Sequence, residues 1–319
     1  MKAVQVAAFG GPEALVEVEL PEPLAGPGQV VVEIAVTAID FVQTQLRRGF
    51  TPGPPLPELP YVPGATIAGE VREAPDAEWL GRKVVTRTAS SRGGYAERAV
   101  ANVDALIPVP EGLPLQHAAA LLDDGSTAIG LIQQAPVKPG EWVLVQAAGG
   151  GLGSLLVQLA HAEGGQVIGT ARGQAKLDLI RDLGAKAAVD YSQPGWTEQV
   201  RAITGTTGPS LVFDGVGGQL GRAAFELTAP GGRFSVHGAS SGTATTVEDP
   251  GEVTVIGVEQ LFELGATVKP RAEQAVAAAA AGRLKPVIGQ TFPLSRAADA
   301  HAAMEARAVI GKTLLLVQP

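Results

Sequence analysis

The chain has 319 residues, enough for two domains with a sizeable core, and 45% of its residues are hydrophobic. Its net charge of −8 argues against broad binding to nucleic acid or to an anionic membrane, because such surfaces need clustered Lys and Arg. The sequence contains no cysteine, which excludes disulfides, a thiolate nucleophile and Cys-ligated zinc.

The N-terminal stretch MKAVQVAAF alternates like a strand and lacks the long apolar core of a signal peptide. No uncharged apolar run reaches the roughly 18 residues that a membrane-spanning helix needs. We therefore expect a cytoplasmic protein without a membrane span.

Two kinds of pattern divide the chain. Residues 1–122 consist of short β-like runs broken by Pro and Gly, and residues 286–319 return to β-like runs that we expect to pack back on them. Residues 123–285 alternate between apolar strands and amphipathic helices, which predicts a parallel sheet covered on both faces. The sequence therefore predicts one β-rich domain built from both ends of the chain and one central α/β domain.

The central domain opens with WVLVQAAGGGLGSLLVQLAH, residues 142–161, in which an apolar run stops at three glycines and resumes with helical spacing. A strand, a glycine turn and a helix in this order can present backbone N–H groups to a phosphate. The alternative is a tight turn that serves only helix–strand packing. We predict dinucleotide binding by the turn and helix start, formed by Ala148, Gly149, Gly150, Gly151, Leu152 and Gly153.

The second strand of this domain ends in VIGTARGQAK, where NAD-dependent proteins present Asp or Glu to the ribose 2′-hydroxyl. No acid stands there; the segment carries Thr170, Arg172 and Lys176 instead. A carboxylate would repel a 2′-phosphate, whereas Arg and Lys pair with it, so the expected cofactor is NADPH. The alternative is that both cations are ordinary solvated charges.

The order and spacing of several segments resemble the medium-chain dehydrogenase/reductase superfamily, and within it the zinc-free quinone oxidoreductases of the zeta-crystallin type. The segments are GGYAE (93–97), GSTA (125–128), VKPGEWVLVQAAGGGLG (137–153), the run GTA…K…LGA…DY (169–191), FDGVGG (213–218) and ARAVIGKTLLL (306–316). The resemblance covers essentially the whole chain. It implies a GroES-like β-rich catalytic domain beside a Rossmann domain with a doubly wound parallel sheet, and NADPH bound between them.

The same resemblance implies hydride transfer from the nicotinamide to a quinone or to the β-carbon of an α,β-unsaturated carbonyl, and a homodimer commonly formed by Rossmann sheet edges. Lys176 and Tyr191 match residues that contact the 2′-phosphate region in that family. Thr127 and the backbone of residues 149–152 are expected to hold the nicotinamide and the pyrophosphate. Such a reaction needs alignment and a group that takes up charge on the carbonyl oxygen, so few side chains are obligatory.

The sequence departs from that family where the nicotinamide is expected to bind. The family's N-x-x-D-x-Y segment reads Asp40, Gln43 and Gln45 at its three defined positions, and Thr66 replaces the Glu of G-x-E-x-x-G. The segment LLDDGSTA places Asp123 where relatives carry apolar residues or, in zinc enzymes, a Cys. Asp40, Gln45 and Asp123 are therefore the candidate catalytic residues.

Three interpretations of the two carboxylates are open. Asp40 and Asp123 can face each other, so that one holds a proton and donates it after hydride transfer. Alternatively, Asp123 or Asp124 caps a helix that starts near Ser126, and Asp40 bonds local backbone N–H groups. A metal on both carboxylates is the third and weakest reading, because no His or Cys stands at the other ligand positions.

Two more residues follow strands of the central domain, at the carboxyl edge where open α/β sheets bind ligands. Asp214 ends the strand in FDGVGG and is either a turn-forming residue or a wall of the cofactor site. His237 follows the strand in FSVHGA and is a candidate for cofactor binding. The remaining histidines, among them His161 and His301, are expected to be structural or exposed.

The first functional hypothesis is an NADPH-dependent oxidoreductase that reduces a quinone or an activated C=C bond of a small molecule. The nearest alternative is a specialised biosynthetic enoyl reductase that acts on an unusual substrate, such as one that bears an amine. A protein that binds NADPH without catalysis, or that binds RNA, is the hypothesis from another class, and the acidic charge weighs against RNA.

Overall fold

The computed structural model describes residues 1–51, 55–205 and 207–317. The chain divides into two compact units, one of residues 1–123 and 272–319 (unit 1) and one of residues 124–271 (unit 2). Unit 1 is thus built from both ends of the chain, as the sequence pattern indicates. The chain returns to unit 1 at residue 272, within helix α8, whereas the sequence pattern places this return at residue 286.

Unit 2 holds a six-stranded parallel sheet in the order β10-β9-β8-β11-β12-β13. This is the doubly wound order, in which the chain turns back at the first strand. The strands are β8 (Trp142–Val145), β9 (Gln166–Ala171), β10 (Ala187–Asp190), β11 (Leu211–Asp214), β12 (Arg233–Val236) and β13 (Thr254–Ile256). The sequence pattern identified the first five; the three-residue strand β13 carries too little pattern to be found.

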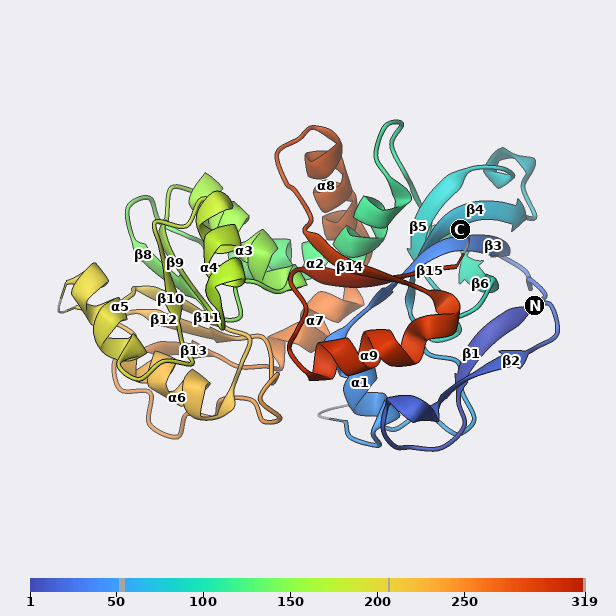
Figure 1. Ribbon diagram of the computed structural model, residues 1–319. Coiled ribbons are helices and arrows are strands. Elements are labelled where there is room, and N and C mark those ends of the chain that lie inside the picture. Colours follow the sequence, from blue (N-terminus) through green and yellow to red (C-terminus); the bar gives the residue numbers. More distant parts are fainter. Residues whose placement is uncertain (52–54, 206, 318–319) are drawn as a thin grey trace. The chain divides into compact units, whose positions relative to one another are not determined.

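Helices cover both faces of this sheet, so its strands are apolar throughout. Figure 1 shows α3 and α4 along one face and α6 along the other. On the face of α5 and α6, the side chains of Trp196, Val200 and Leu227 pack on strand residues such as Ile168 and Phe234. The helices are α3 (Gly151–Ala162), α4 (Gln174–Asp182), α5 (Trp196–Thr204), α6 (Gly218–Leu227) and α7 (Gln260–Ala266).

Unit 1 is built on a seven-stranded sheet in the order β14-β15-β3-β4-β5-β7, with β6 also paired to β3, and on a two-stranded sheet of β1 and β2. The strands are β1 (Lys2–Val6), β2 (Leu15–Glu19), β3 (Gln29–Ile39), β4 (Thr66–Glu73), β5 (Lys83–Arg87), β6 (Arg98–Asn102), β7 (Ile107–Pro108), β14 (Ile288–Pro293) and β15 (Lys312–Leu316). β15 pairs antiparallel with β3, so the C-terminal segment completes the sheet of the N-terminal segment.

Two apolar clusters hold unit 1 together. One fills the interior between strands β3 to β6 with Val30, Val32, Ile34 and their neighbours. The other joins β1, Tyr95 and helix α9 (Ala297–Glu305). Each fully buried Val, Leu or Ile of these clusters contributes roughly 1.5–3 kcal/mol.

The remaining helices are short or shared between units. Helix α1 (Phe41–Arg47) follows β3 directly, and short 3-10 turns cover Pro12–Ala14, Ala77–Trp79, Val103–Ala105 and Leu294–Arg296. Helices α2 (Leu115–Gln134) and α8 (Val268–Ala280) each contribute to both units, because the unit limits fall inside them. Arg271 ties the unit 2 parts of these helices together by donating from Nε to the Ser126 carbonyl at 3.1 Å.

Candidate functional site

The turn between β8 and α3 leaves a set of backbone N–H groups at the helix start. Gly150 is the N-cap of α3, with φ −88° and ψ 177°, and the first N–H groups of an α-helix have no partner within it. The N–H of Gly150 donates to the Ala147 carbonyl at 3.0 Å, and that of Ala148 donates to the Thr170 carbonyl at 3.0 Å. The N–H groups of residues 151–153 therefore have no partner within the helix and can serve a phosphate, whereas Ala148 and Gly150 use their N–H groups to shape the turn.

Gly153 allows the helix to start close to the strand end. A Cβ on Gly153 would lie 2.3 Å from the Ala147 carbonyl oxygen and 2.8 Å from the Ala148 Cα, both of them backbone atoms that cannot move aside. Ala147 itself adopts φ +52°, a conformation that non-glycine residues rarely take. The turn is thus held in one tight shape, as a phosphate cradle requires.

Lys176 lies beside the same turn. It belongs to the first turn of α4, and a Cβ on Gly149 would be only 2.9 Å from the Lys176 Cβ. Arg172, which follows β9, is exposed, and Tyr191, which follows β10, is half-buried. The structure therefore brings a lysine of α4 against the glycine turn, while Arg172 and Tyr191 follow the neighbouring strands β9 and β10.

An acid that the sequence argument did not consider also lies here. Asp190 ends β10 and accepts hydrogen bonds from the N–H of Gly173 at 3.0 Å and from the N–H of Ser192 at 2.8 Å. Partial burial raises the pKa of Asp190, but the bonds from Ser192 and Gly173 and the charge of Arg172 outweigh burial and lower that pKa below its usual value. Both carboxylate oxygens are engaged, so Asp190 ties the start of α4 to the end of β10.

Two further polar residues stand at the carboxyl edge of the sheet. Asp214 is fully buried; its Oδ1 accepts from the N–H groups of Val216 and Gly217, both at 2.9 Å, and its Oδ2 accepts from the Thr245 hydroxyl at 2.5 Å. The turn-forming interpretation of Asp214 is thus confirmed. His237 is buried beside it, and burial lowers the pKa of His237 to about 4 against the opposing charge of Asp214.

Three buried atoms at this edge have no hydrogen-bond partner among the described residues: Oε1 of Gln146 after β8, the Thr170 hydroxyl on β9 and Nδ1 of His237 after β12. Unpaired buried polar atoms in a native structure call for a ligand or water. Separately, the N–H groups of residues 151–153 and the nearby Lys176 form a cradle whose chemistry fits a dinucleotide phosphate.

Unit 1 carries a row of polar side chains along one end of its sheet, which we call the polar row: Lys312, Asp40, Thr37, Thr66, Arg87 and Asp123. Strand register brings them together, because Thr313 pairs with Ile39, Thr37 with Ile67 and Thr66 with Arg87. The Thr37 hydroxyl donates to the Thr66 carbonyl at 2.8 Å, which links the two halves of the row.

Each carboxylate of the polar row is held by its own cation. The Lys312 ammonium contacts Asp40 Oδ1. Arg87 donates hydrogen bonds to Asp123 Oδ1 from Nε, at 2.7 Å, and from Nη2. The Thr66 hydroxyl donates to the second oxygen, Asp123 Oδ2. These partners favour two separate ion pairs over two carboxylates that share one proton.

The alternative readings of these aspartates have different outcomes. Asp40 is the N-cap of α1 and forms a capping box with Gln43, so the expectation that it binds local backbone groups is confirmed. The expectation that Asp123 or Asp124 caps a helix starting near Ser126 is wrong, because α2 begins at Leu115 and both residues lie inside it. No group of three or more metal-ligating side chains occurs among the described residues.

Gln45 and Thr127 are the two site candidates without a strong structural role. Gln45 lies on α1 and Thr127 on α2, and both are half-buried. Neither side chain makes a hydrogen bond to another described residue of the chain, so both groups remain available to a ligand.

Sequence reasoning missed a buried hydrogen-bonded chain behind the polar row. Gln43 Oε1 accepts from the Asp40 N–H at 3.3 Å and from the Tyr95 hydroxyl at 2.9 Å, and that hydroxyl also lies 2.9 Å from Nε2 of His301. Burial, with a contribution from the charge of Arg47, lowers the pKa of His301 to about 3. The only sequence signal was the GGYAE segment that contains Tyr95.

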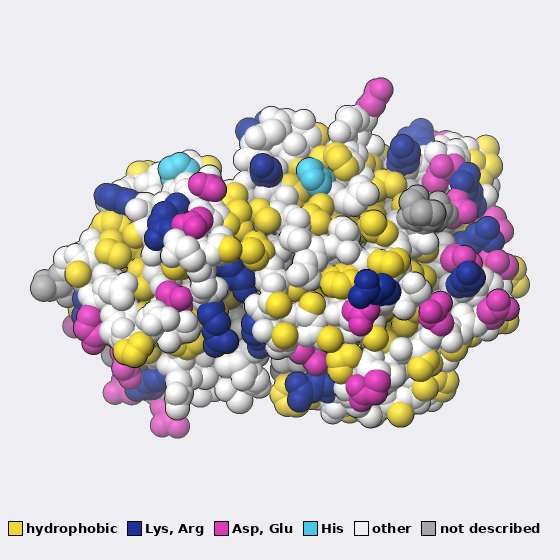
Figure 2. All heavy atoms as spheres, viewed as in Figure 1, with side chains coloured by type: hydrophobic (Ala, Val, Ile, Leu, Met, Phe, Trp, Pro, Cys, Tyr) yellow, Lys and Arg dark blue, Asp and Glu magenta, His cyan; other side chains and the backbone are white. Residues whose placement is uncertain are grey.

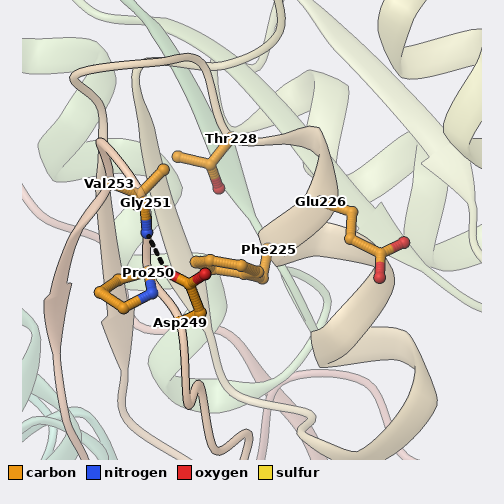
Figure 3. Close-up of a pocket in the computed structure, with 7 residues that line it drawn as sticks. All are labelled: Phe225, Glu226, Thr228, Asp249, Pro250, Gly251 and Val253. Carbon is orange, nitrogen blue, oxygen red and sulfur yellow. Dashed lines mark hydrogen bonds between the residues drawn. The ribbon is translucent and has the colours of Figure 1, made fainter.

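A separate pocket of unit 2 lies away from these groups. It has a volume of about 250 Å³ and is shown in Figure 3 with its seven lining residues, Phe225, Glu226, Thr228, Asp249, Pro250, Gly251 and Val253. Val253 directly precedes β13, so this pocket lies toward the amino ends of the parallel strands. The phosphate cradle lies at their carboxyl ends, which makes the cradle, and not this pocket, the candidate cofactor site.

Comparison with known proteins identifies both parts of the chain. Residues 26–111 match the alcohol dehydrogenase GroES-like domain, and residues 151–269 match the zinc-binding dehydrogenase family. No helix within the described parts of the chain is long and apolar enough to cross a membrane.

Three similar proteins cover nearly the whole chain. A 2-haloacrylate reductase of a Burkholderia species is 32% identical over 323 residues, covering 97% of each protein. The human quinone oxidoreductase is 32% identical over 329 residues, covering 99% of this chain and 98% of its own. The crystal structure of the Escherichia coli quinone oxidoreductase complexed with NADPH has a TM-score of 0.89 and 28% identity, covering 99% of this chain and 100% of its own. The chain belongs to the medium-chain dehydrogenase/reductase superfamily, in its zinc-free quinone oxidoreductase family.

Proposed function

We propose that the protein is an NADPH-dependent oxidoreductase that transfers a hydride to a quinone or to the activated C=C bond of an α,β-unsaturated carbonyl. The observation that carries the proposal is the phosphate cradle, in which residues 151–153 start a helix and Lys176 lies against Gly149. Relatives support both substrate classes, since one is named a quinone oxidoreductase and another a 2-haloacrylate reductase.

The proposed cofactor residues lie at or after the carboxyl ends of five strands, β8 to β12, and on helices α2 and α4. The N–H groups of residues 151–153 bind the pyrophosphate, and Arg172, Lys176 and Tyr191 bind the 2′-phosphate. Thr170 and His237 offer buried polar atoms that can bond to the cofactor. Asp214 holds the loop that follows β11, and Thr127 offers a hydroxyl on α2. NADPH, when bound, supplies the hydride.

On the substrate side, we propose Asp40, Gln45 and Asp123 as the residues of unit 1 that act on the acceptor. Hydride addition leaves negative charge on the acceptor oxygen, which cations and N–H donors stabilise. Asp40 and Asp123 each fix one cation in place, Lys312 and Arg87 respectively. Gln45 carries a half-buried amide that can donate a hydrogen bond.

Arg87 is the more accessible of the two cations. Its side chain is 37% exposed, whereas that of Lys312 is 7% exposed. Nε and Nη2 of Arg87 are occupied by Asp123, and Nη1 makes no bond to another described residue. Arg87 is therefore the proposed direct contact to the acceptor, with Asp123 fixing its orientation.

Steady-state oxidation of NADPH with para-benzoquinone and with a 2-alkenal tests this function. Turnover with either acceptor supports the proposal, and the ratio of the two kcat/KM values decides between quinone reduction and enoyl reduction. NADPH binding without turnover of any acceptor would favour the alternative of a non-catalytic NADPH-binding protein. The surface shown in Figure 2 argues against an RNA-binding role, because its Lys and Arg side chains are interspersed with Asp and Glu.

A homodimer and a cytoplasmic location complete the proposal. Strand β13 forms the edge of the unit 2 sheet and pairs only with β12 among the described strands, so its other side can pair with a second copy. Light scattering coupled to gel filtration measures the oligomeric state. A monomer at micromolar concentration would contradict the dimer without affecting the proposed reaction.

A further inference from the structure

The side-chain amide of Gln43 has an orientation that its hydrogen bonds fix. Its Oε1 accepts from the Asp40 N–H at 3.3 Å and from the Tyr95 hydroxyl at 2.9 Å. A backbone N–H can only donate, so the amide atom that faces Asp40 must be the oxygen and not the nitrogen. The position of Nε2 is thereby fixed as well.

The residues behind Tyr95 hold this arrangement in place. Oε1 of Gln43 carries no proton, so the Tyr95 hydroxyl donates its only proton there and accepts one from Nε2 of His301, 2.9 Å away. The side chains of Tyr95 and His301 are fully buried, and their rings meet edge to face with centroids 5.8 Å apart. The hydrogen bonds therefore run in one direction, from His301 through Tyr95 to Gln43.

Helix α1, which carries Gln43, is also anchored at its other end. The Arg47 side chain is completely buried, donates from Nη1 to the Gly10 carbonyl at 3.1 Å and pairs with Glu305 of α9. A movement of α1 would break these contacts together with the bond to Tyr95. The amide of Gln43 is thus held on a rigid support, as a group that stabilises a transition state must be.

The nitrogen of the same amide has no partner. Gln43 is only 8% exposed, and its Nε2 donates to no residue that the structure describes. Nε2 is not among the unpaired atoms that protein encloses completely, so this end of the amide reaches open space. A donor that is largely desolvated and unpaired loses free energy, which an acceptor bound at Nε2 would restore.

We propose that Gln43 is a further catalytic residue, whose Nε2 donates a hydrogen bond to the oxygen of the substrate that becomes negatively charged during reduction. Tyr95 positions the amide for this contact. The amide lies beside the polar row, because it is bonded to the N–H of Asp40, the member of that row that pairs with Lys312. This inference rests on the proposed function and deepens it.

The reaction creates the charge that this donor meets. When the acceptor gains a hydride at carbon, its π electrons move onto the carbonyl oxygen. That oxygen becomes an enolate-type oxyanion and then takes up a proton from water, while NADPH is left as NADP⁺. A donor already in place stabilises the oxyanion more than the neutral carbonyl and so lowers the barrier. An aspartate, which the motif N-x-x-D-x-Y has at residue 43, would offer no N–H group.

The test compares Gln43→Glu and Gln43→Met with a matched control, Gln29→Glu. Glutamate at residue 43 keeps an oxygen for the two donors and loses both N–H groups, whereas methionine keeps the length and loses every hydrogen-bonding group. Gln29 stands at the other end of β3, where its Nε2 donates to Asn102 and its Oε1 accepts from the Gly26 N–H, both at 3.1 Å. Thermal unfolding gives the folded fraction by which each kcat is corrected.

We expect kcat with a 2-alkenal at pH 8.5 to fall roughly 100-fold in Gln43→Glu and at least about tenfold in Gln43→Met. The dissociation constant of NADPH should change less than about twofold, because the contact is made to the acceptor. Gln29→Glu should stay within about twofold of the parent protein, since its amide is occupied by structural bonds.

The pH profile separates a catalytic donor from a structural group. A carboxyl buried at residue 43 retains its proton more readily than one in water, and the protonated acid again offers a donor. Gln43→Glu should therefore regain most of its kcat between pH 8.5 and pH 6, and Gln43→Met should not. The charged and titratable groups around this residue, Asp40, Lys312, Tyr95, His301 and Arg47, are shared by all variants, so the parent profile is the baseline.

Tyr95→Phe tests the positioning role, because it removes one of the two bonds that orient the amide. We expect kcat to fall about threefold to tenfold in the parent background. In the Gln43→Met background the same change should cause no further loss, since no amide is left to orient. An equal loss in both backgrounds would show that Tyr95 acts on the fold and not through Gln43.

Binding of 4-nitrophenolate in the presence of NADP⁺ gives a readout without turnover. This ligand carries an anionic oxygen on a ring of the size of benzoquinone, and its dissociation constant should rise about tenfold in Gln43→Met and stay unchanged in Gln29→Glu. The inference is overturned by an unchanged kcat in both Gln43 variants, by a loss in Gln43→Glu that acid does not reverse, or by equal binding of 4-nitrophenolate in Gln43→Met and the parent. No NADPH oxidation by the parent protein with any acceptor would refute the proposed function itself.

Discussion

The ammonium of Lys312 contacts the carboxylate of Asp40 where strand β15 begins beside the end of strand β3. The Lys312 side chain is only 7% exposed, and the Asp40 side chain is 24% exposed. Removing one partner of a buried ion pair leaves the other charge uncompensated, which costs about 3–5 kcal/mol when the pair is fully buried. We expect Asp40→Asn to lower the free energy of unfolding by about 2–3 kcal/mol, measured by urea denaturation.

A double-mutant cycle provides the control for this pair. Lys312→Met in the Asp40→Asn background removes the buried ammonium as well as the carboxylate and should recover part of the lost stability. Glu226→Gln breaks the exposed pair with Arg222 and should cost less than about 0.5 kcal/mol. Equal costs for Asp40→Asn and Glu226→Gln would show that Lys312 does not depend on Asp40.

Asp123→Asn tests the proposed role of Arg87 at the acceptor. Asparagine presents one oxygen instead of two and no charge, so the guanidinium loses the partner that orients it. We expect kcat/KM for a 2-alkenal to fall about tenfold while the dissociation constant of NADPH changes less than about twofold, since misplacing one electrostatic group weakens transition-state binding selectively. Unchanged kcat/KM in both Asp123→Asn and Arg87→Ala would remove the polar row from the reaction.

The burial of His301 predicts that the free energy of unfolding decreases in acid. Its pKa falls from 6.5 to about 3 on folding, chiefly through burial and also through the charge of Arg47, and the Tyr95 hydroxyl lies 2.9 Å from its Nε2. Between these pH values the unfolded chain binds more protons than the folded one, so stability is lost as the pH falls below about 6.5. His237 acts in the same direction, with a folded pKa of about 4.

The variant His301→Gln, which keeps a hydrogen-bonding group beside Tyr95, removes one of these two contributions. Unfolding free energies at pH 6 and pH 4.5 should differ by about 1–2 kcal/mol less in the variant than in the parent protein. An identical pH dependence in both proteins would mean that His301 is protonated equally in the folded and unfolded states.

Asp214 is predicted to hold the loop at the carboxyl edge of the sheet. Asp214→Asn leaves at least one of its donors, the N–H groups of Val216 and Gly217 and the Thr245 hydroxyl, without an acceptor. The expected cost is about 1–3 kcal/mol of unfolding free energy. Thr245→Val removes a single donor and should cost less, and the reverse order in thermal denaturation would contradict this arrangement.

The sequence predicts the dinucleotide-binding half of the fold well, because local sequence patterns determine the strands, turns and helices of that half. The run of residues 142–161 predicts a strand, a glycine turn and a helix, and the structure has β8, the turn and α3 in that order. Lys176, which the sequence offers as a partner for the 2′-phosphate, is the third residue of α4. Local periodicity and turn chemistry decide these elements without help from distant residues.

The polar row could not be derived in the same way. Lys312 and Asp40 are 272 positions apart, and only the pairing of β15 with β3 brings them together. Helix α2 continues through Asp123, Asp124 and Gly125, residues that disfavour a helix interior, while Asp123 is fixed by Arg87 and Thr66. Tertiary contacts override local preference at both places, and both lie among the residues proposed to act on the substrate.

The measurement that tests the central claim most directly is the rate of NADPH oxidation by the purified protein with para-benzoquinone as acceptor, compared with the rate for NADH under the same conditions. The account predicts steady enzyme-dependent oxidation with kcat/KM at least about tenfold higher for NADPH, from the contact of Lys176 with the 2′-phosphate. Equal or higher efficiency with NADH, or no oxidation of either coenzyme with this quinone or with a 2-alkenal, would contradict it.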